Sequence, residues 1–460
     1  MSVLPKPFAA STSPPKRPDT PDLRALLAIL LGVALGSLDT AIANTALPAI
    51  AGALHAAPAA SIWVINAYQL AIVATLLPFA ALGDLVGPRR VFLGGLAVFT
   101  VASLACAFTT TLPALATARA LQGVGASGVM SVNIALIGLI FPASRLGRGV
   151  GLNALVVGVS FTLGPTIASL VLSVAAWPWL FAINVPLGIV ALAFAVPALP
   201  HTARHQHHFD LITALLTAVC FAALILALGA AAQREAWSLV LSALAMTIVA
   251  GFLLLRRQAG DPAPMLPVDL LRRPLFALST ITSMSSFTAQ GLAFVSLPFY
   301  FEEVLHRNPV DTGFLMTPWP IIVALAAPIA GRLSDQRFSP GLLGGIGLAI
   351  LGAGLASLAL LPSAPDALDI VLRMAICGAG FGLFQAPNLK ALMSSAPPER
   401  SSGASGVIAM ARLIGQSTGA ALVALCFGLA GAQGPTAALA LGAGFAALAS
   451  LASFARLYVR

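Results

Sequence analysis

The chain has 460 residues, of which 59% are hydrophobic and only 8% are charged. Soluble domains carry about 25% charged residues, so this composition excludes a soluble globular protein. A helix that crosses a lipid bilayer needs roughly 20 predominantly apolar residues, and the sequence contains many such runs. The formal net charge of +9 does not indicate a nucleic-acid partner, because the basic residues are distributed in another pattern, described below.

Residues 1–22 are polar and rich in proline and serine, and the first apolar run has full spanning length. We therefore expect a cytoplasmic N-terminal tail and no cleavable signal peptide. The four cysteines (Cys106, Cys220, Cys377 and Cys426) lie inside apolar runs without metal-ligand spacing. They are predicted to be packing residues, so neither a disulfide framework nor a metal site is expected.

Apolar runs between charged and turn residues predict an all-α integral membrane protein with fourteen spanning helices. The first six are expected near 24–47, 60–82, 91–109, 112–140, 149–173 and 178–198. The other eight are expected near 211–231, 237–255, 275–301, 313–333, 341–362, 367–390, 403–430 and 435–455. The pair within 211–255 decides between twelve and fourteen spans.

The lysines and arginines test this arrangement, because short cytoplasmic loops are enriched in them. With a cytoplasmic N-terminus, 19 of the 24 basic residues fall on the inner side, and only Arg234 and Arg307 fall on the outer side. The remaining three, Arg119, Arg373 and Arg412, lie within spans. This distribution predicts a multi-pass protein of the bacterial inner membrane with both termini in the cytoplasm. The basic excess is then explained by topology and anionic lipid, and no nucleic acid is expected.

The two ends of the chain contain a weak internal repeat. The distance from Asp84 to Arg119 is 35 residues, and that from Asp335 to Arg373 is 38, with a glycine-rich stretch after each arginine. Paired repeats are the common plan of secondary transporters, with substrate bound between them. The predicted domains are a tail (1–22), a six-helix bundle (23–198), a linker with two extra spans (199–273) and a second six-helix bundle (274–460). Four linker histidines are expected to form a solvated loop: His201, His205, His207 and His208.

Motifs along the chain then point to a family. In order, they are Leu38–Pro48 in the first span, Gly83–Arg90 in the loop after the second, Arg119–Gly125 in the fourth, Gly158 with Gly164 and Pro165 in the fifth, and Trp179–Gly188 opening the sixth. Together they resemble the major facilitator superfamily, specifically its fourteen-helix drug:proton antiporter family. The resemblance implies two six-helix bundles plus an inserted helix pair. The sequence departs from the family at Ala80, Leu85, Pro88, Ala168 and Ser169.

Asp39 is the first candidate for proton coupling. It lies 15 residues past Arg24, about 22 Å into the membrane, where a carboxylate must be paired, hydrated or protonated. Arg119 lies at a matching depth and is its natural partner. The resemblance assigns Arg119 a proton-coupling role, while a structural pair that orients two helices is the alternative.

The other two arginines within spans differ from each other. Arg373 follows Asp369 by four residues, so an ordinary pair within one helix is expected. Arg412 has no acid in the membrane core of the second half. Three roles are open for it: binding helix carbonyls, meeting Asp39 across the cavity, or facing substrate.

Further polar and aromatic residues are candidates for a substrate cavity, with helix–helix hydrogen bonds or lipid contact as the alternatives. With Arg412, the predicted cavity residues are Asn44, Asn66, Tyr68, Gln69, Gln122, Phe287 and Phe294.

Two groups of residues are predicted to act in conformational change. A cytoplasmic latch is expected from Gly83, Asp84, Gly87, Arg89 and Arg90, with Gly331 and Asp335 in the second half. By family resemblance, Gly158, Gly164 and Pro165 form an antiporter motif that seals the halves against proton leak.

These observations predict a secondary active transporter that exports small lipophilic compounds in exchange for protons by alternating access. The alternative is a proton-coupled exporter of a specific metabolite such as an amino acid, a sugar or an organic acid. No phosphate-binding Gly-Lys-Ser/Thr occurs, so an ATP-driven pump is excluded, and no clustered carboxylates suggest an enzyme. The expected partners are a small-molecule substrate, protons and lipid, with no cofactor beyond the proton gradient and a monomeric protein.

Overall fold

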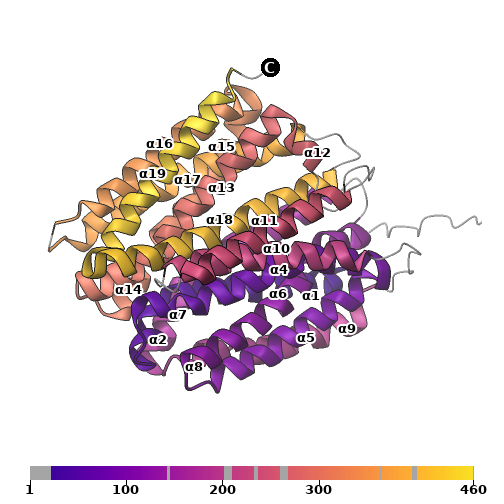
Figure 1. Ribbon diagram of the computed structural model, residues 1–460, viewed down its shortest axis with the longest axis horizontal. Helices are drawn as coiled ribbons and strands as arrows, with labels where there is room; N and C mark the ends of the chain where they lie inside the picture. Colours follow the sequence, from indigo (N-terminus) through magenta and orange to yellow (C-terminus); the bar gives the residue numbers. More distant parts are fainter. Residues whose placement is uncertain are drawn as a thin grey trace, which may run out of the picture.

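The computed structural model describes residues 22–141, 146–200, 210–232, 237–258, 268–362, 364–395 and 401–458, and this part of the chain is almost entirely helical (Figure 1). The first group of helices is α1 (Leu23–Thr45), α2 (Leu47–Ala53), α3 (Pro58–Ser61), α4 (Trp63–Val86), α5 (Pro88–Ala107), α6 (Leu112–Ile140), α7 (Leu146–Val174), α8 (Pro178–Ala182) and α9 (Asn184–Ala198). Next come α10 (Leu211–Ala232), α11 (Trp237–Gln258) and α12 (Val268–Leu271). The last group is α13 (Pro274–Phe299), η2 (Tyr300–Val304), α14 (Pro309–Met316), α15 (Pro318–Gln336), α16 (Pro340–Ala359), α17 (Ala367–Ser395), α18 (Ser401–Ala430), η4 (Gly431–Gln433) and α19 (Gly434–Ala455).

Twelve stretches of the described residues are long and apolar enough to cross a membrane. One of them, Val407–Ala455, runs through both α18 and α19, and α13 is not among the twelve. The prediction of an all-α, multi-pass membrane protein is thus confirmed, whereas fourteen crossings remain a prediction.

A proline divides the predicted span at 313–333 into two shorter helices. The expected span at 313–333 consists of α14 and α15, which meet at Thr317 just before Pro318. The expected span at 178–198 also consists of two helices, α8 and α9, but α9 begins at Asn184 and has no proline at its first two positions. Proline is tolerated in the first turn of a helix because the N–H it lacks would be unpaired there. The new helix α15 therefore begins where the sequence offers Pro318.

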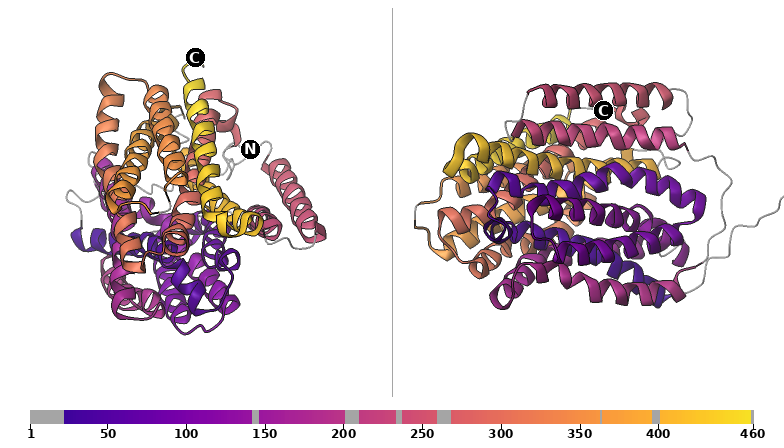
Figure 2. Two further views of the ribbon diagram at one scale, coloured as in Figure 1. Left: turned by 90° about the vertical axis from the view of Figure 1, so that its left-hand side faces the viewer. Right: turned by 60° about the horizontal axis from the view of Figure 1, so that its bottom comes forward.

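The helices form two groups with a pair beside them. Helices α1–α9, here called the first half, and α13–α19, the second half, occupy the lower and upper parts of Figure 1. Helix α10 packs against α11 and also against α4 of the first half and α18 of the second. Figure 2 shows the α10–α11 pair lying along one side of the other helices.

Matching glycines bring helices into close contact in both halves. A Cβ atom added to Gly95 of α5 would lie 2.8 Å from the carbonyl oxygen of Gly125 of α6. A Cβ atom on Gly347 of α16 would lie 2.6 Å from the carbonyl oxygen of Gly380 of α17. Backbones approach this closely only where side chains are absent. The two glycine-rich stretches of the internal repeat therefore serve the same helix packing.

Candidate functional site

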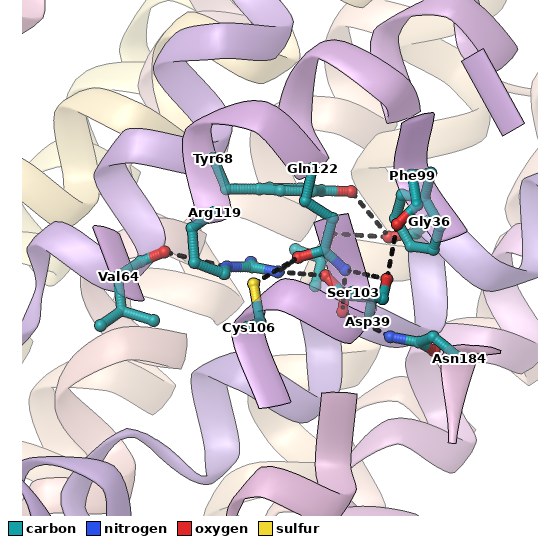
Figure 3. Close-up of polar contacts among 11 residues, drawn as sticks. Gly36, Asp39, Val64, Tyr68, Phe99, Ser103, Cys106, Arg119, Gln122 and Asn184 are labelled. Carbon is teal, nitrogen blue, oxygen red and sulfur yellow. Dashed lines mark hydrogen bonds and ion pairs between the residues drawn. The ribbon is translucent and has the colours of Figure 1, made fainter. Parts of the chain in front are cut away.

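Asp39 of α1 lies at the centre of a polar network inside the first half (Figure 3). Its Oδ2 atom is 2.5 Å from the Nη1 atom of Arg119 on α6. Its Oδ1 atom accepts hydrogen bonds from the Nε2 atom of Gln122 at 2.9 Å and from the Nδ2 atom of Asn184 on α9 at 2.8 Å. The side chains of Asp39 and Arg119 are each 1% exposed. The pairing predicted from matching depths is present, and both carboxylate oxygens are occupied.

Arg119 is held by further contacts on the other side of its guanidinium. Its Nε atom donates to the carbonyl oxygen of Val64 at 3.1 Å, and its guanidinium carbon lies 4.1 Å from the ring centre of Tyr68. Gln122 also accepts a hydrogen bond from Arg119 and donates one to Ser103. Charged groups are tolerated in a low-dielectric interior when they are paired and hydrogen-bonded in this way.

The network places two predicted cavity residues away from the cavity. Tyr68 stacks on Arg119 and donates a hydrogen bond to the carbonyl oxygen of Gly36 at 3.3 Å, and Gln122 bridges Arg119 and Asp39. Both therefore contact the ion pair within the first half. Asn184, the third group that binds Asp39, was not predicted. Asn184 lies in the Trp179–Gly188 motif. Its polar amide within an apolar span was the feature of the sequence that could have identified it.

A small pocket lies between the two halves. Its lining comprises Thr40, Asn44, Gln69 and Phe161 from the first half and Gln290, Gly291, Phe294, Val295 and Gln416 from the second. Its volume is about 20 Å³, enough for a single water molecule. A larger guest requires the halves to move apart.

The pocket contains three of the predicted cavity residues, Asn44, Gln69 and Phe294, and three polar residues that were not predicted there, which are Thr40 and a pair of glutamines. The missed pair, Gln290 of α13 and Gln416 of α18, is joined by a hydrogen bond of 3.2 Å. Glutamines within apolar spans were the signal that identified Gln69, and the same signal was present for this pair.

Two groups in this pocket have no hydrogen-bond partner among the described residues. They are the side-chain oxygens of Asn44, 6% exposed, and Gln69, 4% exposed. The side-chain oxygen of Asn66 is also buried without a partner, although Asn66 does not line the pocket. Phe287 likewise lies outside the lining and packs edge-on against Phe381, with ring centres 5.5 Å apart.

The two other arginines within spans have contrasting surroundings. Arg373 pairs with Asp369, with 2.8 Å between Nε and Oδ1, which confirms the expected pair within one helix. Arg412 of α18 is partly exposed and makes no hydrogen bond or ion pair to any residue that the structure describes. Asp39 is bonded to Arg119 instead. Among the described residues, Arg412 therefore binds neither helix carbonyls nor Asp39, and a position facing substrate stays a prediction.

The predicted latch residues occupy helix ends. Arg90 donates to the carbonyl oxygen of Val86 at 3.2 Å, and Arg89 donates to that of Val196. Gly87, with φ of 95°, joins α4 to α5 in a conformation that favours glycine. The side chain of Asp84 lies outside the described residues.

In the second half, Asp335 pairs with Lys390 of α17, with 2.6 Å between Oδ1 and Nζ. A Cβ atom on Gly331 would lie 3.8 Å from that of Ala386, whereas one on Gly83 would press on Val132. The linker histidines, at 201–208, lie outside the described residues, so the expected loop there stays a prediction.

The predicted antiporter motif on α7 contacts both halves. Gly164 lies against Ala41 of α1, and a Cβ atom on Gly158 would meet open space. The Oγ atom of Ser169 donates to the carbonyl oxygen of Pro309 of α14 at 2.9 Å. Ser169 is one of the departures from the family pattern, and it bonds the first half to the second.

Arg456 is a buried charge that sequence reasoning placed among cytoplasmic cations. It is 5% exposed and donates to the Oδ1 atom of Asn388 at 2.7 Å and to the Oγ atom of Ser279 at 3.1 Å. Its pKa is lowered to about 10 by burial. The side chain therefore joins α13, α17 and α19 near the C-terminal end of α19.

With this geometry established, comparison with known proteins gives the family. Residues 29–420 match the family model described as the Major Facilitator Superfamily. The chain belongs to the major facilitator superfamily. The match confirms the resemblance predicted from the motifs, and its family and relatives are transporters rather than enzymes.

Three curated relatives illustrate the range of this family. The uncharacterized transporter YebQ of Escherichia coli (strain K12) is 51% identical over 435 residues, covering 94% of this chain and 95% of its own. The riboflavin transporter RibZ of Clostridioides difficile (strain 630) is 30% identical, covering 87% of each chain. The multidrug resistance protein Stp of Mycobacterium tuberculosis (strain CDC 1551 / Oshkosh) is 30% identical, covering 87% of this chain and 75% of its own.

A solved structure shows the same fold. The POT family transporter PepTSo superposes with a TM-score of 0.69 at 17% identity, covering 96% of this chain and 99% of the other. At this identity the similarity describes the helix arrangement alone.

Proposed function

We propose that this protein is a proton-coupled secondary transporter that exports small organic compounds across the bacterial inner membrane by alternating access. It crosses the membrane fourteen times as a monomer, with both termini in the cytoplasm and α10–α11 as the inserted pair between two six-helix bundles. The proton gradient supplies the energy, and no cofactor takes part.

The observation that carries this proposal is the position of α1, which serves two regions at once. One face of the helix carries Asp39, bonded to Arg119, and another carries Thr40 and Asn44, which line the pocket between the halves. Protonation of Asp39 removes the charge that Arg119 binds, and so changes the interactions that hold α1 in place. A proton and a cargo that act on one helix can each favour a different conformation, which is what coupling requires.

Alternating access requires contacts between the halves that can break, and α7 forms such contacts with the second half. The hydroxyls of Thr166 and Thr317 lie 3.0 Å apart, next to the bond from Ser169 to Pro309. Alternating access breaks these bonds in one state and makes them in the other. We assign Gly158, Gly164 and Pro165 to this seal, and the predicted latch residues to the opposite, cytoplasmic side.

Multidrug and antibiotic-resistance proteins among the relatives support small lipophilic compounds as cargo. Export of a specific metabolite is the second candidate. It is favoured by the unpartnered oxygens of Asn44 and Gln69, which suit a cargo with defined hydrogen-bond donors, and by a relative described as a riboflavin transporter.

The test is proton exchange in everted membrane vesicles acidified by respiration, followed with a fluorescent pH probe. A compound that is exchanged for protons makes the vesicle interior less acidic when it is added. We would screen cationic, neutral and anionic compounds with the unaltered protein, with Asp39→Asn, and with Asp366→Asn as a matched control, since Asp366 is exposed. We expect exchange with the unaltered protein and the control, and none with Asp39→Asn at equal amounts of folded protein.

Proton exchange that persists in Asp39→Asn would support a transporter but contradict Asp39 as its proton-binding site. No exchange with any compound would contradict proton-coupled export.

A further inference from the structure

Arg412 lies on the side of α18 that faces the junction of the two halves. Gly415 and Gly419 on this helix pack against α13, and Met410 and Leu413 pack into the core of the first half. At 100° per residue, Arg412 projects between these two surfaces. Its side chain therefore points toward the space between the halves and not toward lipid.

Arg412 also adjoins the pocket described above. It precedes Gln416, a lining residue, by four positions, and side chains four apart share one face of a helix. The distance along the axis is about 6 Å. A group bound by Arg412 thus lies one helical turn toward the cytoplasm from the pocket.

The charge of Arg412 has no counterion in the described protein. The carboxylate of Asp39 is occupied by Arg119, and Asp369 is occupied by Arg373. An arginine within the membrane is costly unless it is paired, and it marks a binding site or a pathway. The space between the halves therefore carries one positive charge that an anion from outside the chain can neutralise.

The pocket adds a second, independent indication of a ligand. The oxygens of Asn44 and Gln69 are buried and accept no hydrogen bond from a described residue, and an unsatisfied acceptor favours a partner that donates. Phe161 and Phe294 supply apolar walls. Together these groups present two acceptors and an apolar surface, one turn away from a guanidinium.

We propose that the cargo is a small organic acid: its carboxylate binds Arg412, its N–H or O–H groups donate to Asn44 and Gln69, and its apolar part packs between Phe161 and Phe294. This inference rests on the proposed transport function and specifies its substrate class. Arginine binds a carboxylate through two parallel hydrogen bonds, so the same guanidinium repels a cationic drug of equal size.

The test uses three compounds that differ only in charge. 4-Aminobenzoate, 4-aminobenzamide and 4-aminobenzamidine share a ring and an amine and carry an anionic, a neutral and a cationic group. Binding to the purified protein in detergent is measured as a concentration-dependent rise in Tm, because a ligand that binds the folded state stabilises it. The variants are Arg412→Gln, Arg412→Lys and the control Arg337→Gln, which removes an exposed charge.

We expect the benzoate to stabilise the unaltered protein and Arg337→Gln at a concentration at least tenfold lower than the amide needs, and the amidine to have no effect. Arg412→Gln should abolish this preference, and Arg412→Lys should keep part of it. A preference for the amidine, a benzoate preference that survives Arg412→Gln, or no response to any of the three would overturn the proposal.

Binding also separates this inference from the proposed function. Arg412-dependent binding of the benzoate without proton exchange in vesicles would keep the anion site and contradict the transporter. Proton exchange driven by cations, unchanged in Arg412→Gln, would keep the transporter and contradict the anion site.

Discussion

The network around Asp39 and the pocket between the halves are both buried and polar, and they lie on different faces of α1. In the network, every oxygen of Asp39 is bonded, and Arg119 has an ion pair, a carbonyl acceptor and an aromatic ring as partners. In the pocket, the oxygens of Asn44 and Gln69 have no partner among the described residues.

Asp39 and Arg119 are therefore satisfied within the protein, whereas the oxygens of Asn44 and Gln69 are available to bind a ligand. Burying a polar group is unfavourable unless it is hydrogen-bonded, so an unpaired acceptor that lines a pocket can be satisfied by a bound molecule. Around Asp39 and Arg119, neighbouring helices supply the partners of both charged groups, although the Oδ1 atom of Asn184 in the same network has none among the described residues. Between the halves, where contacts must be made and broken, a bound molecule can supply them.

The largest expected effect comes from breaking the satisfied network. Arg119→Gln leaves the carboxylate of Asp39 buried without a counterion, and loss of one partner of a buried pair costs about 3–5 kcal/mol. We expect this loss in denaturant unfolding of the detergent-solubilised protein. The double variant Asp39→Asn/Arg119→Gln, which removes both charges, should recover much of it, giving a large coupling energy in the double-mutant cycle.

Arg412→Gln provides the comparison, because it makes the same substitution where no partner is lost. Its effect should stay below about 1 kcal/mol. Equal destabilisation by the two substitutions would show that Arg412 has a structural partner and would remove the distinction between the two regions.

The sequence indicates Arg119 as the natural partner of Asp39 for a simple physical reason, although it leaves Arg412 as a second candidate. The rise of a helix is fixed, so counting residues from a predicted helix end gives the depth of each residue in the membrane. Two opposite charges at the same depth are expected to pair, because an unpaired charge there is costly. The Asp369–Arg373 pair follows from spacing within one helix. The membrane location follows from composition, and the family follows from the order of its motifs.

Depth alone does not give the rotation of a helix about its axis. For this reason Tyr68 and Gln122 were assigned to the cavity although they face the ion pair, and Gln290 and Gln416 were overlooked. The burial of Arg456, which follows the last span, was not predicted. Asn388 and Ser279 come from distant segments, and their position around Arg456 depends on packing that no local pattern encodes.

A smaller effect is expected from one substitution made in both regions. Gln69→Leu removes a buried oxygen that has no partner, and replacing such a group by an apolar one is neutral or stabilising, by up to about 1 kcal/mol. Gln122→Leu removes a donor to Asp39 and should cost about 1–3 kcal/mol. Unfolding in detergent measures both. Gln69→Leu should nonetheless impair proton exchange with the cargo. A stability loss equal to that of Gln122→Leu would contradict the prediction that the side-chain oxygen of Gln69 has no partner within the protein.

The smallest expected effect concerns Glu302, in η2 just after α13, where a carboxyl group is partly buried and forms no ion pair with a described residue. Burial, with the nearby charge of Glu303, raises its pKa from 4.5 to about 7. Because the folded state binds this proton more tightly than the unfolded state, the protein loses stability as the pH rises from about 4.5 through 7. Glu302→Gln removes the titrating group, so its Tm relative to the unaltered protein should be higher at pH 8 than at pH 5, with Asp366→Asn as the control. A Tm difference between the two proteins that does not change with pH, or that changes in the opposite direction, would contradict this prediction. It would mean that Glu302, like Asp39, has a partner that stabilises its charged form.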